Sequence, residues 1–218
     1  MGIFVIIACI IMLELIFDVE TQKLFSDITS DDPADLGVSV VSVYKRELDD
    51  QGEEIHGEIK SFWHPSVGIH PIIDEMWEWF EHADRIIGFN SKKFDVPVLR
   101  PHYSKDIFKL PHFDILEKVK NVLGRRISLN ALAQDTLGVN KTDVGTNAVY
   151  YFANPTAENL KKLQTYCESD VLITRDLYDF GRKQNHLNYM DTKWNKIVTV
   201  DVDFSYPPKN DEAQIGLF

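Results

Sequence analysis

Cysteine is scarce in this sequence, with only Cys9 and Cys167 among 218 residues. Two thiols at unrelated positions argue against a disulfide framework and against a zinc site built from thiolates. The seven histidines are scattered, and none forms the H-x-x-x-H pair that suits a metal on a helix. We therefore expect a protein of a reducing compartment, the cytoplasm.

Basic residues are also in short supply. The sequence has 23 Lys and Arg against 34 Asp and Glu, which gives a formal net charge of -11. The chain as a whole therefore does not attract a polyanion by bulk charge. Contact with nucleic acid needs a local basic patch or bound cations.

A hydrophobic run long enough to span a bilayer is missing. The apolar run at residues 3–13 is too short, has no basic residue before it and meets Glu14 at once. A signal peptide is one alternative, although cleavage near the end of the run would disturb the strand that follows. A translation start at Met12 is another. We expect no stable membrane association, and treat residues 1–12 as an N-terminal extension or the start of the first strand.

Residues 15–21, Leu-Ile-Phe-Asp-Val-Glu-Thr, form an apolar β-strand pattern that contains two carboxylates. Successive side chains of a strand alternate, so Asp18 and Glu20 point to one face while Phe17 and Val19 point to the other. Adjacent carboxylates repel each other at neutral pH unless a proton or a metal ion lies between them. The pair indicates a functional site, and the alternative is an edge strand with a solvated polar face.

The rest of the chain alternates between strand and helix patterns, and its 44% hydrophobic and 26% charged residues are typical of one soluble domain. Strand patterns cover residues 37–44, 58–63, 85–90 and 196–204. Helix patterns cover residues 71–83, 112–123, 129–137 and 157–182, with Ser128 and Thr156 as N-caps and Asp114 as a cap or first-turn acid. Residues 147–152 are rich in aromatics and have no assigned form.

Two further acids stand in apolar surroundings. Asp95 follows the strand at 85–90 and precedes Val-Pro-Val-Leu, where its alternative role is a helix N-cap. Asp170 lies on the apolar face of the late helix, one turn after Tyr166. An acid on such a face is costly unless it is paired or bound to a metal. A buried hydrogen bond to Tyr166 is the alternative to the catalytic role that we favour.

The sequence therefore contains four acids that different strands and helices direct towards the interior: Asp18, Glu20, Asp95 and Asp170. A site for two magnesium ions requires such a set, because hard cations take oxygen ligands and carboxylates crowd together only around positive charge.

Three segments resemble the motifs of the DEDD (DnaQ-like) 3′–5′ exonuclease superfamily: residues 17–21, 90–95 and 166–170. The third has the Y-x-x-x-D form, as in the proofreading domains of family B DNA polymerases. The sister subtype carries His where this chain has Thr165. The helix at 129–137 with Gly138 also resembles the helix that precedes the third motif in those polymerases. The resemblance implies an α/β domain over residues 13–184 with an RNase H-like fold, a mixed central β-sheet flanked by helices.

The resemblance also implies a function. Asp18, Glu20, Asp95 and Asp170 would hold two Mg²⁺ or Mn²⁺ ions, and Tyr166 would orient the attacking water. The products would be nucleoside 5′-monophosphates released from a 3′ end. The motifs do not decide between DNA and RNA, and our preference for single-stranded DNA rests on the C-terminal peptide described below. Thr21 and Asn90 match positions that contact the terminal nucleotide. Lys92, Lys93, Arg125 and Arg126 are candidates for contacts with the nucleic-acid backbone, and a solvated surface is the alternative for each.

Several alternatives remain at this point. An RNase H-like endonuclease fits the acids but not the spacing of Tyr166. A catalytically inactive nucleic-acid-binding module would not need all four acids and the tyrosine. An oligoribonuclease-like or RNA-processing enzyme, or a phosphodiesterase for dinucleotides, would share the same motifs.

The C-terminal part falls outside the resemblance. Residues 185–204 form an extension whose strand at 196–204 could join the sheet or form a hairpin. Residues 205–218 contain Pro207 and Pro208 and have the composition of a flexible tail. The tail ends in Gln214, Ile215, Gly216, Leu217 and Phe218, a pentapeptide similar to the bacterial sliding-clamp binding motif. The pentapeptide predicts a sliding clamp as partner, and the alternatives are a disordered tail or a tail that packs on its own domain.

Overall fold

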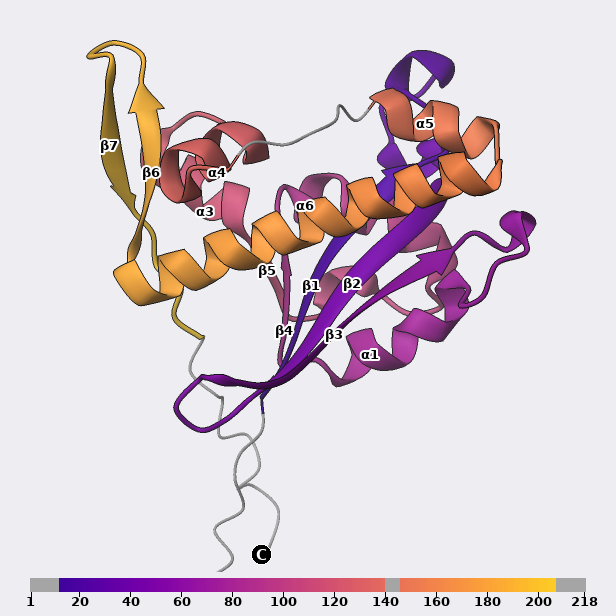
Figure 1. Cartoon of the computed structure of the whole chain (residues 1–218), viewed down its shortest axis with the longest axis horizontal. Coiled ribbons are helices and arrows are strands. Elements are labelled where there is room, and N and C mark those ends of the chain that lie inside the picture. The colour runs from indigo at the N-terminus through magenta and orange to yellow at the C-terminus, as the bar shows by residue number, and fades with distance from the viewer. Residues whose placement is uncertain (1–11, 140–145, 207–218) are drawn as a thin grey trace, which may run out of the picture.

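The fold is built on a five-stranded sheet with strand order β3-β2-β1-β4-β5, as seen in a computed structural model that describes residues 12–139 and 146–206 (Figure 1). Neighbouring strands are antiparallel from β3 through β2 to β1 and parallel from β1 through β4 to β5. The sheet is therefore mixed, and the α/β class expected from the sequence is confirmed.

The strands of this sheet are β1 (Met12–Thr21), β2 (Val38–Leu48), β3 (Glu54–Trp63), β4 (Arg85–Gly88) and β5 (His112–Asp114). The helices are α1 (Trp77–His82), α2 (Asp95–Leu99), α3 (Ile115–Leu123), α4 (Leu129–Leu137), α5 (Thr146–Ala153) and α6 (Ala157–Gln184). A separate two-stranded sheet consists of β6 (His186–Asp191) and β7 (Lys196–Asp201).

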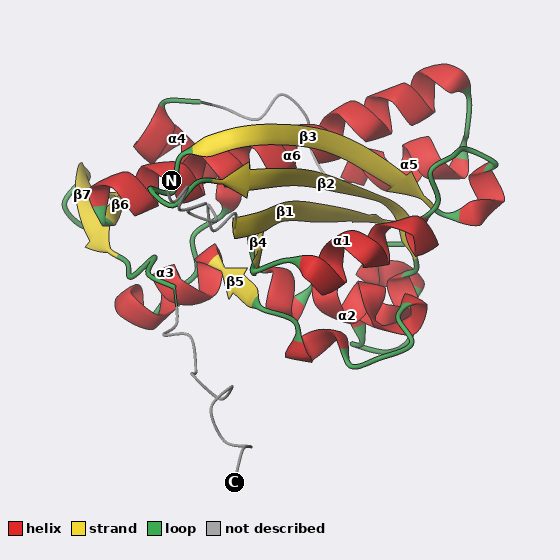
Figure 2. Ribbon diagram, turned by 90° about the horizontal axis from the view of Figure 1, so that it is seen from below, coloured by secondary structure: helices red, strands yellow, loops and turns green. Residues whose placement is uncertain are grey.

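The central strand β1 divides its side chains between two cores. Phe17 and Val19 pack with α1 and α2, whereas Ile16 packs with residues of α3, α4 and α6. Figures 1 and 2 show the same division, with α6 across one face of the sheet and α1 and α2 on the opposite face. Asp18 and Glu20 share the parity of Ile16 and therefore face α6, as the alternation of the strand predicts.

The long helix α6 has both of its ends defined by local hydrogen bonds. The Thr156 side chain accepts a hydrogen bond from the backbone N–H of Asn159, and Asn185 adopts the left-handed conformation that ends the helix. Ser128 caps α4 in the same way, and Gly138 ends it. The N-caps predicted from the sequence are therefore confirmed.

Three elements differ from the sequence prediction. His112–Asp114 pairs with β4 as the short parallel strand β5, so the helix begins at Ile115, with Asp114 as its N-cap. The helix expected over 71–83 is limited to a 3₁₀ turn (Ile73–Met76) followed by α1, because Ile72 is extended and bridges to Trp63. The aromatic-rich stretch that had no assigned form lies within α5.

The C-terminal extension returns to the domain. The strand predicted at 196–204 pairs with β6 of the same chain, which the sequence analysis did not find, and it ends at Asp201. Phe204 stacks on Phe113 and lies edge-on to Tyr178, both of which belong to the core beneath α6. Residues after β7 therefore contribute to the same core as β1.

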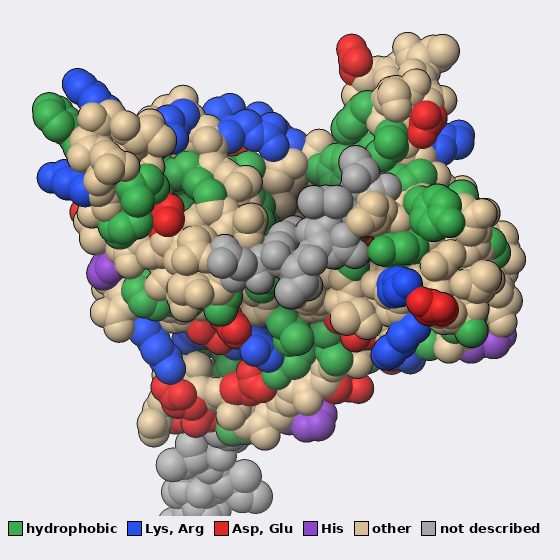
Figure 3. Space-filling view, turned by 45° about the horizontal axis from the view of Figure 1, so that its top comes forward, with side chains coloured by type: hydrophobic (Ala, Val, Ile, Leu, Met, Phe, Trp, Pro, Cys, Tyr) green, Lys and Arg blue, Asp and Glu red, His purple; other side chains and the backbone are tan. Residues whose placement is uncertain are grey.

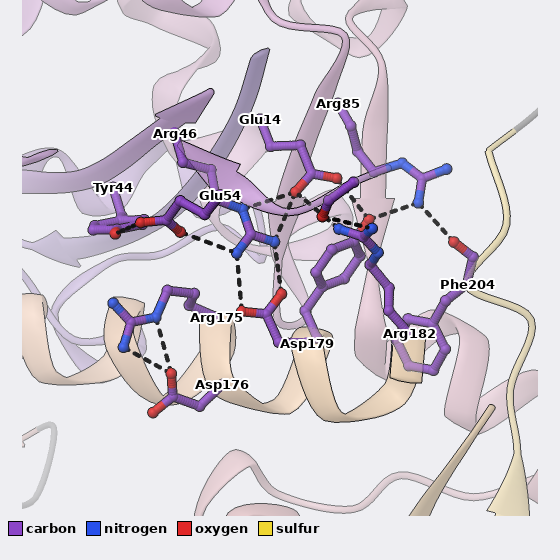
Figure 4. A network of polar contacts seen from close by, with 12 residues as sticks. Glu14, Tyr44, Arg46, Glu54, Arg85, Arg175, Asp176, Asp179, Arg182 and Phe204 are labelled. Carbon is purple, nitrogen blue, oxygen red and sulfur yellow. Dashed lines mark hydrogen bonds and ion pairs between the residues drawn. The ribbon is translucent and has the colours of Figure 1, made fainter. Parts of the chain in front are cut away.

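A buried polar network ties the start of β1 to α6 and to this returning segment (Figure 4). Glu14 is fully buried, forms an ion pair with Arg46 at 2.7 Å and accepts hydrogen bonds from the hydroxyls of Tyr178 and Tyr206. Arg46 also pairs with Asp179 of α6 at 2.7 Å. Each charge in the network has partners, as a buried charge requires.

Among the residues described, no helix combines the length and the apolar character that crossing a bilayer requires. The N-terminal residues 1–11 and the C-terminal pentapeptide proposed for a clamp lie outside the described residues.

Candidate metal-binding active site

The acids of the first and last motifs meet on the α6 side of the sheet. One carboxylate oxygen from each of Asp18, Glu20 and Asp170 lies within 4.8 Å of the other two. The strand β1 supplies Asp18 and Glu20, and the middle of α6 supplies Asp170. The packing of α6 across β1 therefore converts a sequence separation of about 150 residues into one acidic cluster.

Cys167 fixes how closely α6 approaches β1. Its thiol is fully buried and donates a hydrogen bond to the backbone carbonyl of Asp18 at 3.4 Å. Burial and the carboxylates of Asp18 and Glu20 raise the pKa of this thiol, so it stays protonated. Cys167 therefore acts as a packing residue beneath the cluster.

Asp95 lies beside this cluster, with its side chain buried. Its Oδ1 accepts a hydrogen bond from the backbone N–H of Val19, between Asp18 and Glu20, at 3.0 Å. The pairing of β1 with β4 ends at Ile16, so the backbone N–H of Val19 has no acceptor in β4. The carboxylate of Asp95 accepts this hydrogen bond instead. Burial, with a further contribution from the charges of Asp114 and Asp170, raises the pKa of Asp95 to about 7.

Asp95 is the first residue of α2 and not its N-cap, which is Phe94. The alternative role weighed from the sequence is therefore wrong, because the carboxylate is engaged by β1.

Tyr166 lies one helical turn before Asp170 and is half-buried. Burial raises the pKa of its phenol, and the charges of Asp170, Glu20 and Asp18 raise it further. The phenol therefore keeps its proton at physiological pH, and its hydroxyl lies in the field of the same three carboxylates that form the cluster.

An open cleft of about 430 Å³ leads to the acids. It is lined by Asp18, Phe89, Asn90, Leu116, Arg126, Ile127, Ser128, Leu129 and Asp170. The walls therefore come largely from the loop after β4 and from the segment that leads into α4. Of the lining residues, the sequence predicts Asp18, Asn90, Arg126 and Asp170 as candidates.

Asn90 lines the cleft in the left-handed conformation, with φ 65°. Its backbone N–H donates to Asp114, and its side-chain oxygen accepts a hydrogen bond from Arg126 at 3.0 Å. The Thr21 hydroxyl donates to the carbonyl of Lys23 just after a bulge in β1. The structure therefore brings Asn90 to the cleft, whereas Thr21 stabilises the turn that ends β1.

The basic candidates fall into different settings. Lys92 pairs with Glu117 at 2.6 Å, and Lys93 lines a smaller pocket next to Asn90. Arg125 packs over the ring of Tyr189, whereas Arg126 reaches the cleft itself. Arg126 is therefore the basic candidate with the most direct place in the site.

Asp114 is the residue whose role the sequence analysis missed. Its carboxylate accepts hydrogen bonds from the backbone N–H groups of Asn90, Lys92 and Glu117. The sequence signal was present, because a buried parallel strand that ends in Asp points its last side chain at the loop of the neighbouring strand. The helix pattern that begins at residue 112 predicts for Asp114 only the role of a cap or first-turn acid.

The fold and the acidic cluster together define an α/β domain in which β1 and α6 bring together carboxylate oxygens that could hold a divalent metal. The sequence model of the RNase H superfamily matches residues 15–180, and the chain belongs to this superfamily. Superfamily membership and the cluster together indicate a nuclease. No curated protein sequence matches this chain.

The fold is also similar to the structure of the family B DNA polymerase from the hyperthermophilic archaeon Pyrobaculum calidifontis, with a TM-score of 0.53 and 18% sequence identity. The match covers 78% of this chain and 24% of the polymerase chain. At this identity the likeness shows the fold alone, and this chain spans about a quarter of the length of that polymerase.

Proposed function

We propose that the protein is a metal-dependent 3′–5′ exonuclease of the DEDD superfamily, Y-x-x-x-D subtype. The observation that carries the proposal is the cluster of Asp18, Glu20 and Asp170 within 4.8 Å, with Tyr166 one turn away on the same helix. The likeness to a family B DNA polymerase supports this reading, because the three motifs resemble those of the proofreading domains in that family.

The donor set fits hard divalent cations. The cluster offers only carboxylate oxygens, which suit Mg²⁺ or Mn²⁺. Two ions would be held by Asp18, Glu20, Asp170 and the neighbouring Asp95. When bound, such ions lower the pKa of a water molecule and stabilise negative charge on the leaving 3′ oxygen.

The protein's own groups position the reactants. The protonated Tyr166 hydroxyl can hydrogen-bond to the attacking water, but at neutral pH it is not a general base. Arg126 and Asn90 are hydrogen-bonded to each other in the cleft wall, and this supports our proposal that they contact a phosphate and a base of the terminal nucleotide. Thr21, at the end of β1, stays a second candidate for this contact.

The direct test is digestion of single-stranded oligonucleotides that carry a label at the 5′ or the 3′ end. We expect a ladder that shortens from the 3′ end, release of nucleoside 5′-monophosphates, and dependence on Mg²⁺ or Mn²⁺. A circular single strand should resist digestion. Cleavage of the circle would instead indicate an endonuclease, and inactivity on all substrates would indicate a binding module.

The choice of DNA over RNA depends on a different part of the chain. It rests on the C-terminal residues Gln214, Ile215, Leu217 and Phe218, a candidate clamp-binding peptide that lies outside the described residues. Rates on matched DNA, RNA and dinucleotide substrates test this choice and its oligoribonuclease-like alternative. Titrating a fluorescent peptide of the last ten residues against a bacterial sliding clamp, with Leu217→Ala and Phe218→Ala as controls, tests the partner. Equal binding by the two control peptides would exclude the sliding clamp as a partner.

A further inference from the structure

The β6–β7 hairpin projects from the domain next to α4 (Figure 1). Within the described residues, β6 and β7 pair only with each other. The helix α4 holds it in place, because the Thr136 hydroxyl hydrogen-bonds to the backbone of Asn188 and Asp135 accepts from the backbone N–H of Met190. The hairpin is therefore fixed to the helix whose first residue, Leu129, lines the cleft.

The hairpin tip, residues 191–196, has a defined conformation. Asp191 accepts hydrogen bonds from the backbone N–H groups of Lys193 and Trp194, and Asn195 adopts a left-handed conformation. Trp194 is 64% exposed, and the ammonium group of Lys193 lies 5.0 Å from the centre of its ring. A large aromatic side chain is thus held in solvent beside a cation, with no core to fill.

Basic side chains connect this tip to the cleft. Lys196 has the same parity in β7 as Val198, which packs towards the domain next to Tyr189. Arg125 lies over the ring of Tyr189 at 5.1 Å, and the next residue, Arg126, lines the cleft and contacts Asn90. Figure 3 shows basic and apolar side chains together at the projecting end of the hairpin, at the upper left.

We propose that the hairpin tip, with Arg125, binds the single-stranded nucleic acid whose 3′ end occupies the cleft. Trp194 stacks on a base, and Lys193, Lys196 and Arg125 contact phosphates. This surface rests on the proposed nuclease function and deepens it, because it adds a second contact outside the cleft that holds the reacting end.

Charge and continuity favour this occupant. The chain carries a net charge of -11, so it needs a basic surface wherever it meets a polyanion away from bound cations. Leu129 and Asp135 are six positions apart in α4, which corresponds to about 9 Å of helix, and Asp135 contacts the hairpin at Met190, next to its tip. One strand can therefore reach both places.

The test compares the variant K193A/W194A/K196A with the wild type. The matched control is K105A/F108A/K109A, which also removes one exposed aromatic and two lysines. Phe108 is 50% exposed and precedes β5, so it lies toward the end of the sheet opposite the cleft. Circular dichroism checks the folding of each variant.

Binding of a fluorescein-labelled 20-nucleotide oligothymidylate is measured by anisotropy in EDTA, which separates binding from cleavage. We expect the hairpin variant to raise Kd by about fivefold or more, the low end of the effect of losing one stacked base. The slope of log K against log salt should become shallower by about 1.4, at about 0.7 per lost phosphate contact on a single strand. The control variant should match the wild type.

Hydrolysis of the p-nitrophenyl ester of thymidine 5′-monophosphate with Mn²⁺ reports the cleft alone, because this substrate is too small to reach the hairpin. We expect equal rates for the hairpin variant and the wild type. An unchanged Kd in the hairpin variant would overturn the proposal, and so would equal losses in the hairpin and control variants. If the variant kept its affinity for the oligonucleotide but dissociated a dimer in sedimentation, the hairpin would be a self-association surface and the proposal would fail. Absence of hydrolysis in the wild type would contradict the nuclease function but leave the binding result interpretable.

Discussion

The carboxylate of Asp114 holds the backbone of Asn90, because its Oδ1 accepts a hydrogen bond from the Asn90 N–H at 2.9 Å. The same carboxylate accepts from the N–H groups of Lys92 and Glu117. One buried side chain thus fixes both the start of α3 and the turn that leads to Asp95. Asp114 is a positioning residue, since it reaches the site through this turn.

Asp114→Ala should therefore impair activity without removing a ligand of the acidic cluster. Three partly buried backbone donors would lose their acceptor, and we expect the free energy of unfolding to fall by about 2–3 kcal/mol. Misplacement of Asn90 should lower kcat by about tenfold to a hundredfold. Asp114→Asn keeps one acceptor oxygen and should recover part of the rate, which a purely electrostatic role would not predict.

Asp106→Ala is the matched control, because Asp106 also caps a helical turn, by accepting from the N–H of Phe108, but lies away from the cleft. Its kcat should equal that of the wild type. Wild-type activity in Asp114→Ala would refute the positioning role.

The second prediction concerns the acidic cluster. Asp170→Asn removes one negative charge from three crowded carboxylates, so in EDTA the variant should be at least as stable as the wild type. The free energy of unfolding of the wild type should rise by about 2.7 kcal/mol when Mg²⁺ or Mn²⁺ is present at 100 times its Kd. The variant should not show this rise. Thermal melts with and without metal measure both effects. Asp176→Asn, on an exposed part of α6, is the control, and an equal metal response in both variants would argue against the site.

Tyr166→Phe separates positioning from metal binding. The substitution removes only the hydroxyl that positions the water, so we expect metal-dependent stabilisation to persist while kcat falls by about a hundredfold. Tyr150→Phe, an exposed tyrosine of α5, should have no effect. Loss of metal binding in Tyr166→Phe would assign the phenol a structural role at the cluster instead.

The sequence was sufficient for the parts of the site that obey local periodicity. The alternation of β1 placed Asp18 and Glu20 on one face, and the helical spacing of α6 placed Asp170 beside Tyr166, so only the packing of α6 on β1 had to be inferred from the resemblance. The cleft wall was less accessible, because Arg126 and Asn90 are 36 residues apart and meet only through the loop before α4.

The sequence failed where tertiary pairing overrides a local pattern. His112–Asp114 has the composition of a helix start, yet it completes a parallel ladder with β4. The sequence does not predict β6, because only two of its six residues, Leu187 and Tyr189, are buried, and so short an alternation is a weak strand signal. The burial of Phe204 depends on a gap over Gly181, and no periodicity reveals such a gap.

The last prediction tests whether this returning segment belongs to the folded domain. The ring of Phe204 lies so close to Gly181 that a Cβ atom there would overlap it. Arg85 then holds the segment by donating to the backbone carbonyls of Phe204 and Ser205 at 2.8 Å and 2.7 Å. Phe204→Ala should lower the free energy of unfolding by about 3–5 kcal/mol, as expected for a buried phenylalanine.

Gly181→Ala should also destabilise the wild type, because the added methyl group and the Phe204 ring compete for one space. In the Phe204→Ala background, Gly181→Ala should lower the free energy of unfolding by much less. A double-mutant cycle of urea unfolding measures this coupling. Phe108→Ala, an exposed aromatic, should show no coupling to Gly181→Ala. Additive effects of Gly181→Ala and Phe204→Ala would mean that the ring does not occupy this gap. In that case a chain truncated after Gln184 should still fold. If Phe204 does occupy the gap, as the structure shows, the truncated chain should not fold.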